Sequence, residues 1–196
     1  MTGDGNADVL ARDGGGALWL YPGNGAGGLG AGRAIGSGWN VMDLVTGAGD
    51  MTGDGRADLL ARDTSGNLWV YPLVGDAVFG ARSLVSAGWG AMTSILGPGD
   101  LSGDGRADVL ARDAAGGRWL YRGNGTGGVA AGTLISGGWQ AMTALVTPGD
   151  WNHAAGNDLL TRDAAGRLWL YPRDNAGGLG PPVAIGSGWT LMDDIG

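Results

Sequence analysis

Short apolar segments alternate with Gly- and Asp-rich stretches along the whole chain, and this pattern returns at a spacing of 50 residues. In the second repeat the apolar segments are 57–62, 67–72, 81–86 and 92–97. Within 67–72, Leu68 and Val70 fall on one face of a strand, and the aromatic residues beside them fall on the other. Segments this short, bounded by turn residues, predict four β-strands per repeat.

Five of the positions that carry the same residue type in all four repeats define the repeat frame. They are Trp19, Trp69, Trp119 and Trp169; Tyr21, Tyr71, Tyr121 and Tyr171; Trp39, Trp89, Trp139 and Trp189; Met42, Met92, Met142 and Met192; and Asp13, Asp63, Asp113 and Asp163. Four strands per repeat of about 50 residues are typical of β-propeller blades. The sequence therefore predicts an all-β fold, a propeller of four four-stranded blades in a single domain (1–196), with repeats 1–50, 51–100, 101–150 and 151–196.

The two ends of the chain align with internal repeat positions. Met1 aligns with Met51, and 192–196 aligns with 42–46, a strand that belongs to the next blade. We therefore expect the C-terminal strand to join the N-terminal blade and close the ring. The alternative is that these repeats form part of a larger ring, either within a longer array or in a homo-oligomer with a second copy.

Composition excludes several classes of function. Every acidic residue is Asp and every basic residue is Arg, so two strong helix formers are missing and long helices are not expected. The net charge of −7 disfavours nucleic acid as a partner. No run approaches the ~20 apolar residues of a spanning helix, so no membrane insertion is expected, and the first repeat is not preceded by a signal-peptide pattern. The absence of Cys excludes thiol catalysis and zinc–thiolate sites.

Two acidic loops, 50–58 and 100–108, predict metal sites. Oxygen-bearing side chains stand at loop positions 1, 3, 5 and 9, Gly at 6, and position 7 offers its backbone carbonyl. This spacing matches the first part of an EF-hand loop, and ligation by oxygen alone favours Ca²⁺. The alternative is a set of turns in which Asp serves geometry alone. The predicted ligands are Asp50, Thr52, Asp54, Arg56 and Asp58, and Asp100, Ser102, Asp104, Arg106 and Asp108.

The two outer loops are weaker candidates for Ca²⁺. The first has oxygen-bearing side chains at Thr2, Asp4, Asn6 and Asp8 but no residue at position 1. In the fourth, Ala154 replaces a ligand, so we expect little or no binding there.

These loops, together with Phe79-Gly80 and 97–100 (Gly-Pro-Gly-Asp), resemble the FG-GAP (VCBS) repeats of integrin α-subunit propellers and of many secreted bacterial proteins. The resemblance covers essentially the whole chain. It departs in the degraded fourth loop, in Phe79 being the single Phe, and in four repeats instead of the usual seven. It implies a Ca²⁺-stabilised propeller in a secreted or extracellular protein. Some similar propellers are lectins with pockets between blades, and others are adhesion or accessory modules of secreted enzymes.

The sequence offers little for catalysis. The single His, His153, lies in the degraded loop and is not repeated, and no Ser stands in a Gly-x-Ser-x-Gly motif. The Gly-rich segments 23–28 and 123–128 are not followed by a helix, so they indicate hairpin loops and not phosphate sites. We therefore expect the chain not to be an enzyme.

The second repeated Trp position is the candidate ligand site. Each of these residues follows a Gly at a strand end, where an aromatic ring could face a groove between blades and stack on a sugar. The alternative is that they fill the core between blades. The predicted function is a calcium-stabilised extracellular module that binds carbohydrate, and the alternative is protein adhesion or scaffolding for a secreted enzyme. The candidate ligand-binding residues are Trp39, Trp89, Trp139 and Trp189.

One repeated feature receives no function from the sequence, the four Arg-Asp pairs that end the first strand of each repeat. The Asp is expected to begin the turn to the next strand. The pairs are Arg12-Asp13, Arg62-Asp63, Arg112-Asp113 and Arg162-Asp163.

Overall fold

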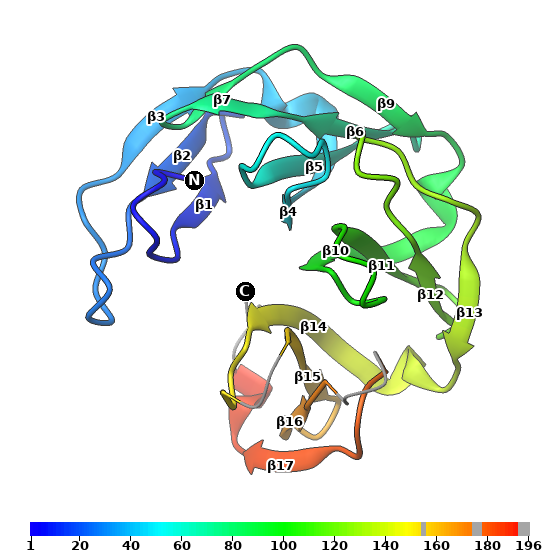
Figure 1. Ribbon diagram of the computed structural model, residues 1–196. Helices are drawn as coiled ribbons and strands as arrows, with labels where there is room; N and C mark the ends of the chain where they lie inside the picture. Colours follow the sequence, from blue (N-terminus) through cyan, green and yellow to red (C-terminus); the bar gives the residue numbers. More distant parts are fainter. Residues whose placement is uncertain (154–155, 174–177, 192–196) are drawn as a thin grey trace. The chain divides into compact units, whose positions relative to one another are not determined.

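The computed structural model describes residues 1–153, 156–173 and 178–191, which form antiparallel sheets joined by loops and short 3-10 turns (Figure 1). By its internal contacts the chain divides into two compact units. Unit 1 comprises Met1–Gly90 with Gly125–Gly128, and unit 2 comprises Ala91–Asn124 with Val129–Gly196.

Unit 1 holds two main sheets and a hairpin. The first sheet has three strands in the order β1-β2-β3, and the second has four in the order β4-β5-β6-β9. β7 and β8 form the hairpin after β6. The elements are β1 (Val9–Arg12), β2 (Leu18–Tyr21), β3 (Arg33–Gly36), η1 (Trp39–Val41), β4 (Met42–Gly49), β5 (Asp58–Asp63), β6 (Leu68–Tyr71), β7 (Leu73–Gly75), β8 (Val78–Phe79), β9 (Ser83–Ser86) and, at the unit boundary, η2 (Trp89–Ala91).

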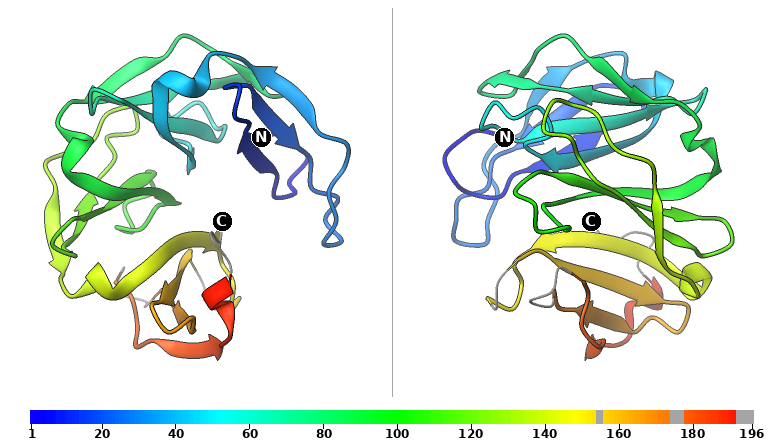
Figure 2. Two further views of the ribbon diagram at one scale, coloured as in Figure 1. Left: turned by 180° about the vertical axis from the view of Figure 1, so that it is seen from behind. Right: turned by 45° about the vertical axis from the view of Figure 1, so that its right-hand side comes forward.

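Unit 2 holds two four-stranded sheets with the orders β10-β11-β12-β13 and β14-β15-β16-β17. Figure 2 shows the strands of each of these sheets lying side by side in chain order. The elements are β10 (Met92–Gly99), β11 (Asp108–Asp113), β12 (Arg118–Tyr121), β13 (Thr133–Ser136), η3 (Trp139–Ala141), β14 (Met142–Gly149), β15 (Asp158–Asp163), β16 (Leu168–Tyr171), β17 (Val183–Gly186) and η4 (Trp189–Leu191).

The sheets are offset from the sequence repeats by one strand. The last strand of each of the first three repeats pairs with the first strand of the following repeat, as in Val45 opposite Ala61, Ile95 opposite Ala111 and Leu145 opposite Thr161. The expectation that 42–46 belongs to the next blade is therefore confirmed. The equivalent strand for the first sheet was predicted at 192–196, which lies outside the described residues, so the predicted ring closure is not part of this description.

Alternation along the second strand of each repeat builds the core. In β6, Leu68 and Val70 are buried, whereas Trp69 and Tyr71 are half-buried. β2 and β16 repeat this arrangement with Leu at both buried positions. β12 has the same burial pattern, but its first buried residue is Arg118.

Each unit has its own cluster of buried apolar side chains. The unit 1 cluster is built around Leu18, Trp39, Met42, Leu59 and Ala61. The unit 2 cluster is built around Leu101, Leu110, Leu120, Trp139, Leu145 and Leu159. The predicted fold class is confirmed: the chain is all-β, with four antiparallel sheets of the kind that form propeller blades, of which the first has three strands among the described residues. None of the short helical turns in the described part of the chain is long and apolar enough to cross a membrane.

Candidate functional site

The first carboxylate of each complete acidic loop is held by its own backbone. Asp50 accepts hydrogen bonds from the N–H groups of Gly53, Asp54 and Gly55, with N–O distances of 2.7, 3.1 and 2.8 Å. Asp100 accepts the equivalent three bonds in the next loop. These bonds close each loop into a tight turn, with Gly55 and Gly105 at positive φ.

The last carboxylate of each loop is fully buried and ties the loop to the neighbouring strands. Asp58 accepts from the N–H groups of Met51 and Thr52 in its own loop and of Leu73 in β7. Burial raises the pKa of Asp58, although these bonds act in the opposite direction. Asp108 makes the matching contacts in unit 2. Both residues therefore act as structural acceptors for buried backbone groups.

The loops contain the right kind of atom for Ca²⁺, but their side chains are not gathered around one point. The predicted ligand atoms are oxygens, and the buried hydroxyls of Thr52 and Ser102 have no hydrogen-bond partner among the described residues. However, no group of three acidic, His or Cys side chains within the described ranges is placed to hold a metal ion. The calcium sites at 50–58 and 100–108 stay a prediction from the sequence.

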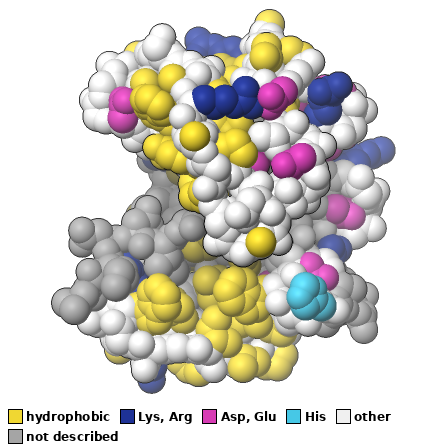
Figure 3. All heavy atoms as spheres, turned by 90° about the vertical axis from the view of Figure 1, so that its left-hand side faces the viewer, with side chains coloured by type: hydrophobic (Ala, Val, Ile, Leu, Met, Phe, Trp, Pro, Cys, Tyr) yellow, Lys and Arg dark blue, Asp and Glu magenta, His cyan; other side chains and the backbone are white. Residues whose placement is uncertain are grey.

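The outer loops repeat part of this arrangement. Asp8 accepts from the N–H groups of Thr2 and Gly23 and pairs with the N-terminal amine at 2.8 Å. Burial alone would raise the pKa of Asp8, but these contacts lower it to about 2. Asp4 accepts from the N–H of Asn6. In the fourth loop, the predicted ligand gap at Ala154 lies outside the described residues. His153 is exposed on the surface (Figure 3).

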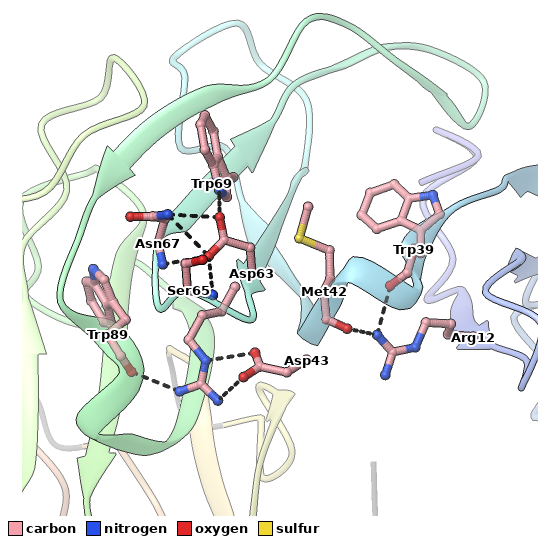
Figure 4. A network of polar contacts seen from close by, with 10 residues as sticks. Arg12, Trp39, Met42, Asp43, Asp63, Ser65, Asn67, Trp69 and Trp89 are labelled. Atoms are coloured by element: carbon pink, nitrogen blue, oxygen red, sulfur yellow. Dashed lines mark hydrogen bonds and ion pairs between the residues drawn. The ribbon is translucent and has the colours of Figure 1, made fainter.

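The Arg of each Arg-Asp pair holds the turn that carries the second repeated Trp. Arg62 donates to the carbonyl oxygen of Trp89 at 2.9 Å and pairs with Asp43 at 2.8 Å. Figure 4 shows Arg12 donating to the carbonyl oxygens of Trp39 and Met42. Arg112 and Arg162 make the same bond to Trp139 and Trp189. These Arg residues therefore position the candidate ligand residues, a role that the sequence analysis did not assign.

The Asp of each pair organises the following turn, as expected. Asp63 accepts from the N–H groups of Ser65 and Asn67 and from the indole Nε1 of Trp69 (Figure 4). These bonds, with the one from Trp69 as the largest cause, lower the pKa of Asp63 to about 2.

The four candidate Trp residues differ in exposure. Trp39, Trp89 and Trp139 are buried, whereas Trp189 is 38% exposed. Trp39 packs against Tyr71 and Phe79, with ring centroids 4.7 and 5.8 Å apart. These contacts show that the buried members of the set contribute to the core, which is the alternative role that the sequence left open.

Trp139 also lines a cavity of about 430 Å³ within unit 2. Its ring lies 4.7 Å from that of Tyr171, and its Nε1 donates to the Ser136 hydroxyl at 2.8 Å. The cavity is formed by residues of two successive sheets and of the turn between them. We call it the Arg118 cavity and define it by Arg118, Leu120, Ser136, Trp139, Tyr171 and Leu179.

Arg118 is the unusual residue of this cavity. It is 5% exposed, and its guanidinium carbon lies 4.2 Å from the centroid of the Trp139 ring. Its Nε and Nη1 have no hydrogen-bond partner among the described residues. Burial lowers the pKa of Arg118 to about 10, so it remains charged at neutral pH. Arg118 is not among the residues predicted from the sequence, although it stands where the other repeats have Leu18, Leu68 and Leu168.

Comparison with known proteins places the repeats in a family. A family model described as an FG-GAP-like repeat matches residues 1–61 and 50–111, which together span more than half of the chain. The chain belongs to the FG-GAP-like repeat family. The resemblance inferred from the loops and from Phe79-Gly80 is thereby confirmed. A comparison with curated proteins finds no match.

Two solved structures similar to this FG-GAP-like chain are lectins. One is a lectin from Agrocybe aegerita, described as recognising non-reducing terminal N-acetylglucosamine. It is 23% identical to this chain with a TM-score of 0.58, and the match covers 97% of this chain and 51% of the lectin. The other is the BP39L lectin from Burkholderia pseudomallei, with 19% identity, a TM-score of 0.58, and coverage of 91% and 51%. This chain therefore spans about half the length of either lectin, and at these identities the similarity concerns the fold.

Proposed function

We propose that this protein is a carbohydrate-binding module and that the Arg118 cavity is its sugar site. The observation that carries the proposal is the cavity itself, where an aromatic pair, Trp139 and Tyr171, meets polar groups in a concave surface of mixed polar and apolar character. Ligand sites in proteins combine these features, in volumes of about 300–1,000 Å³. The fold similarity to two lectins supports the proposal.

The chemistry of the cavity favours binding over catalysis. Among its described lining residues, the titratable groups are Arg118 and Tyr171. Burial raises the pKa of Tyr171, so the phenol is neutral at physiological pH. Glycoside hydrolysis ordinarily needs two carboxyl groups, one to give a proton and one to act as base or nucleophile. This lining offers neither, so we infer a module that holds sugar without cleaving it.

An extracellular location and stabilisation by Ca²⁺ are part of the proposal, supported by the family and by the oxygen-rich loops. The other function left open by the sequence, protein adhesion or scaffolding, predicts no selective binding of glycans. The two functions therefore separate in one experiment.

A glycan array at millimolar Ca²⁺ tests the proposal. Trp139→Ala should abolish binding, whereas Trp151→Ala removes an exposed ring outside the repeated positions and should leave binding unchanged. Because Trp139 is a core residue, truncating it costs about 3–5 kcal/mol of stability and could unfold the protein.

A second variant, Leu179→Phe, fills the cavity without emptying the core. Phe79 occupies the equivalent repeat position in unit 1, where it packs on Trp39 and Tyr71. Leu179→Phe should therefore fold normally and lose sugar binding. A folded wild-type protein that binds no glycan on the array would refute the proposed function and favour adhesion.

A further inference from the structure

We propose that the Arg118 cavity selects an acidic sugar, a hexuronic acid whose carboxylate binds the Arg118 guanidinium. This inference rests on the proposed function and names the class of ligand for the same site.

The first observation is the replacement of an apolar residue by a charge at one repeat position. Leu18, Leu68 and Leu168 are buried where Arg118 stands in the third repeat, so an aliphatic side chain satisfies the packing at this position. A buried charge at such a position is unfavourable unless an opposite charge compensates it. The described residues supply no acidic partner for Arg118, whereas they pair Arg62 with Asp43 and Arg167 with Asp163.

The second observation is the state of the guanidinium. The guanidinium carbon lies over the Trp139 ring, while the buried Nε and Nη1 lack partners within the described ranges. A guanidinium held in this way presents N–H donors in a planar fork that matches a carboxylate. Arg118 therefore lines the cavity with a charge that no described residue compensates and that a ligand oxyanion would neutralise.

The rest of the lining suits a sugar ring. Tyr171 offers an aromatic ring and Leu120 and Leu179 offer apolar contacts for the C–H groups of a pyranose. The Ser136 hydroxyl accepts a bond from Trp139 Nε1, so its own hydrogen can be donated to a ligand. A single cationic group matches a single carboxylate, and the chain's net charge of −7 disfavours polyanions.

Calorimetric titrations with matched methyl glycosides test this inference. Glucuronide against glucoside, and galacturonide against galactoside, differ only in a carboxylate in place of the C6 hydroxymethyl group. We expect the acidic sugar of at least one pair to bind about 10- to 100-fold more tightly. Arg118→Leu, which installs the residue of the other repeats, should remove this preference, and Arg118→Gln serves as a second neutral variant.

Arg82→Leu is the charge-matched control, because Arg82 also stacks on a Trp ring, 4.2 Å from the centroid of Trp69, but lies outside the cavity. It should keep the preference. Equal affinity for both sugars of each pair, or a preference that survives Arg118→Leu, would overturn the inference and leave the sugar site standing. Absence of binding to all four glycosides would also overturn the inference, and only a folded protein that binds nothing on the glycan array either would overturn the proposed function.

Discussion

Single residues distinguish repeats that are otherwise alike. The strand that carries Arg118 has the same burial pattern as β6 and β16, so the backbone accepts either Leu or Arg at this position. What differs is the ability of the side chain to form a charged hydrogen bond with a ligand. Residues held for binding often reduce the stability of the free protein.

Arg118→Leu should therefore raise the stability of the ligand-free protein. Replacing buried charge by an apolar residue that fits is often stabilising, by up to about 1–4 kcal/mol, which corresponds to a rise in Tm of several degrees for a chain of this size. Thermal unfolding followed by circular dichroism measures the change. A lower Tm for Arg118→Leu would show that Arg118 has a stabilising role in the free protein.

At the scale of the element, hairpins are organised by carboxylates that accept backbone N–H groups. Asp63 and Asp163 each accept hydrogen bonds from the backbone of a turn and from the indole of the following strand. The pKa of each carboxyl is lowered to about 2, and the hydrogen bond from Trp69 or Trp169 is the largest cause. Because the folded pKa lies below the ordinary value of 3.8, these bonds contribute fully above about pH 4.

The stability of the protein should therefore fall as the pH decreases from about 4 toward 2. Asp63→Asn removes one titrating group and keeps an oxygen acceptor, so it should make the fall shallower. Urea unfolding at a series of pH values, followed by Trp fluorescence, gives the slope. An identical slope in Asp63→Asn would exclude this carboxylate as a source of the acid sensitivity.

The two complete acidic loops are elements in which calcium binding, expected from the sequence, can be tested by experiment. If Ca²⁺ binds at 50–58 and 100–108, removing it with EDTA should lower Tm, because an ion that binds only the folded state stabilises it by about 2.7 kcal/mol at 100 times its Kd. Asp54→Asn combined with Asp104→Asn should lose this response, because each substitution removes the charge of a predicted calcium ligand. Both side chains are exposed, so the substitutions should perturb the fold little. An unchanged melt after verified metal removal would show that the backbone hydrogen bonds to Asp50 and Asp100 suffice.

The structure agrees with the sequence-based predictions at features that recur in every repeat. The strands, the Asp turns and the Gly positions of the loops were predictable because they recur in phase and because short alternating segments admit few folds. The Arg118 cavity was not predictable, because it depends on which side chains of successive sheets meet. Leu179 in unit 2 and Phe79 in unit 1 share a repeat position, and only the three-dimensional structure shows what each of them packs against.

At the scale of the whole molecule, four similar repeats do not make four equal sites. Arg118 has no counterpart at 18, 68 or 168, so acidic sugar should bind at one site per chain. Calorimetry with the preferred glycoside gives this stoichiometry directly. A value near four would indicate that the repeated Trp positions, and not Arg118, determine binding.

The most direct test of the central claim is a titration of wild-type protein and Leu179→Phe with the best ligand from the glycan array. We predict saturable binding by the wild type and loss of that binding in Leu179→Phe, with unchanged circular dichroism spectra. Undiminished binding by the folded Leu179→Phe variant would contradict the claim that the Arg118 cavity is the sugar site.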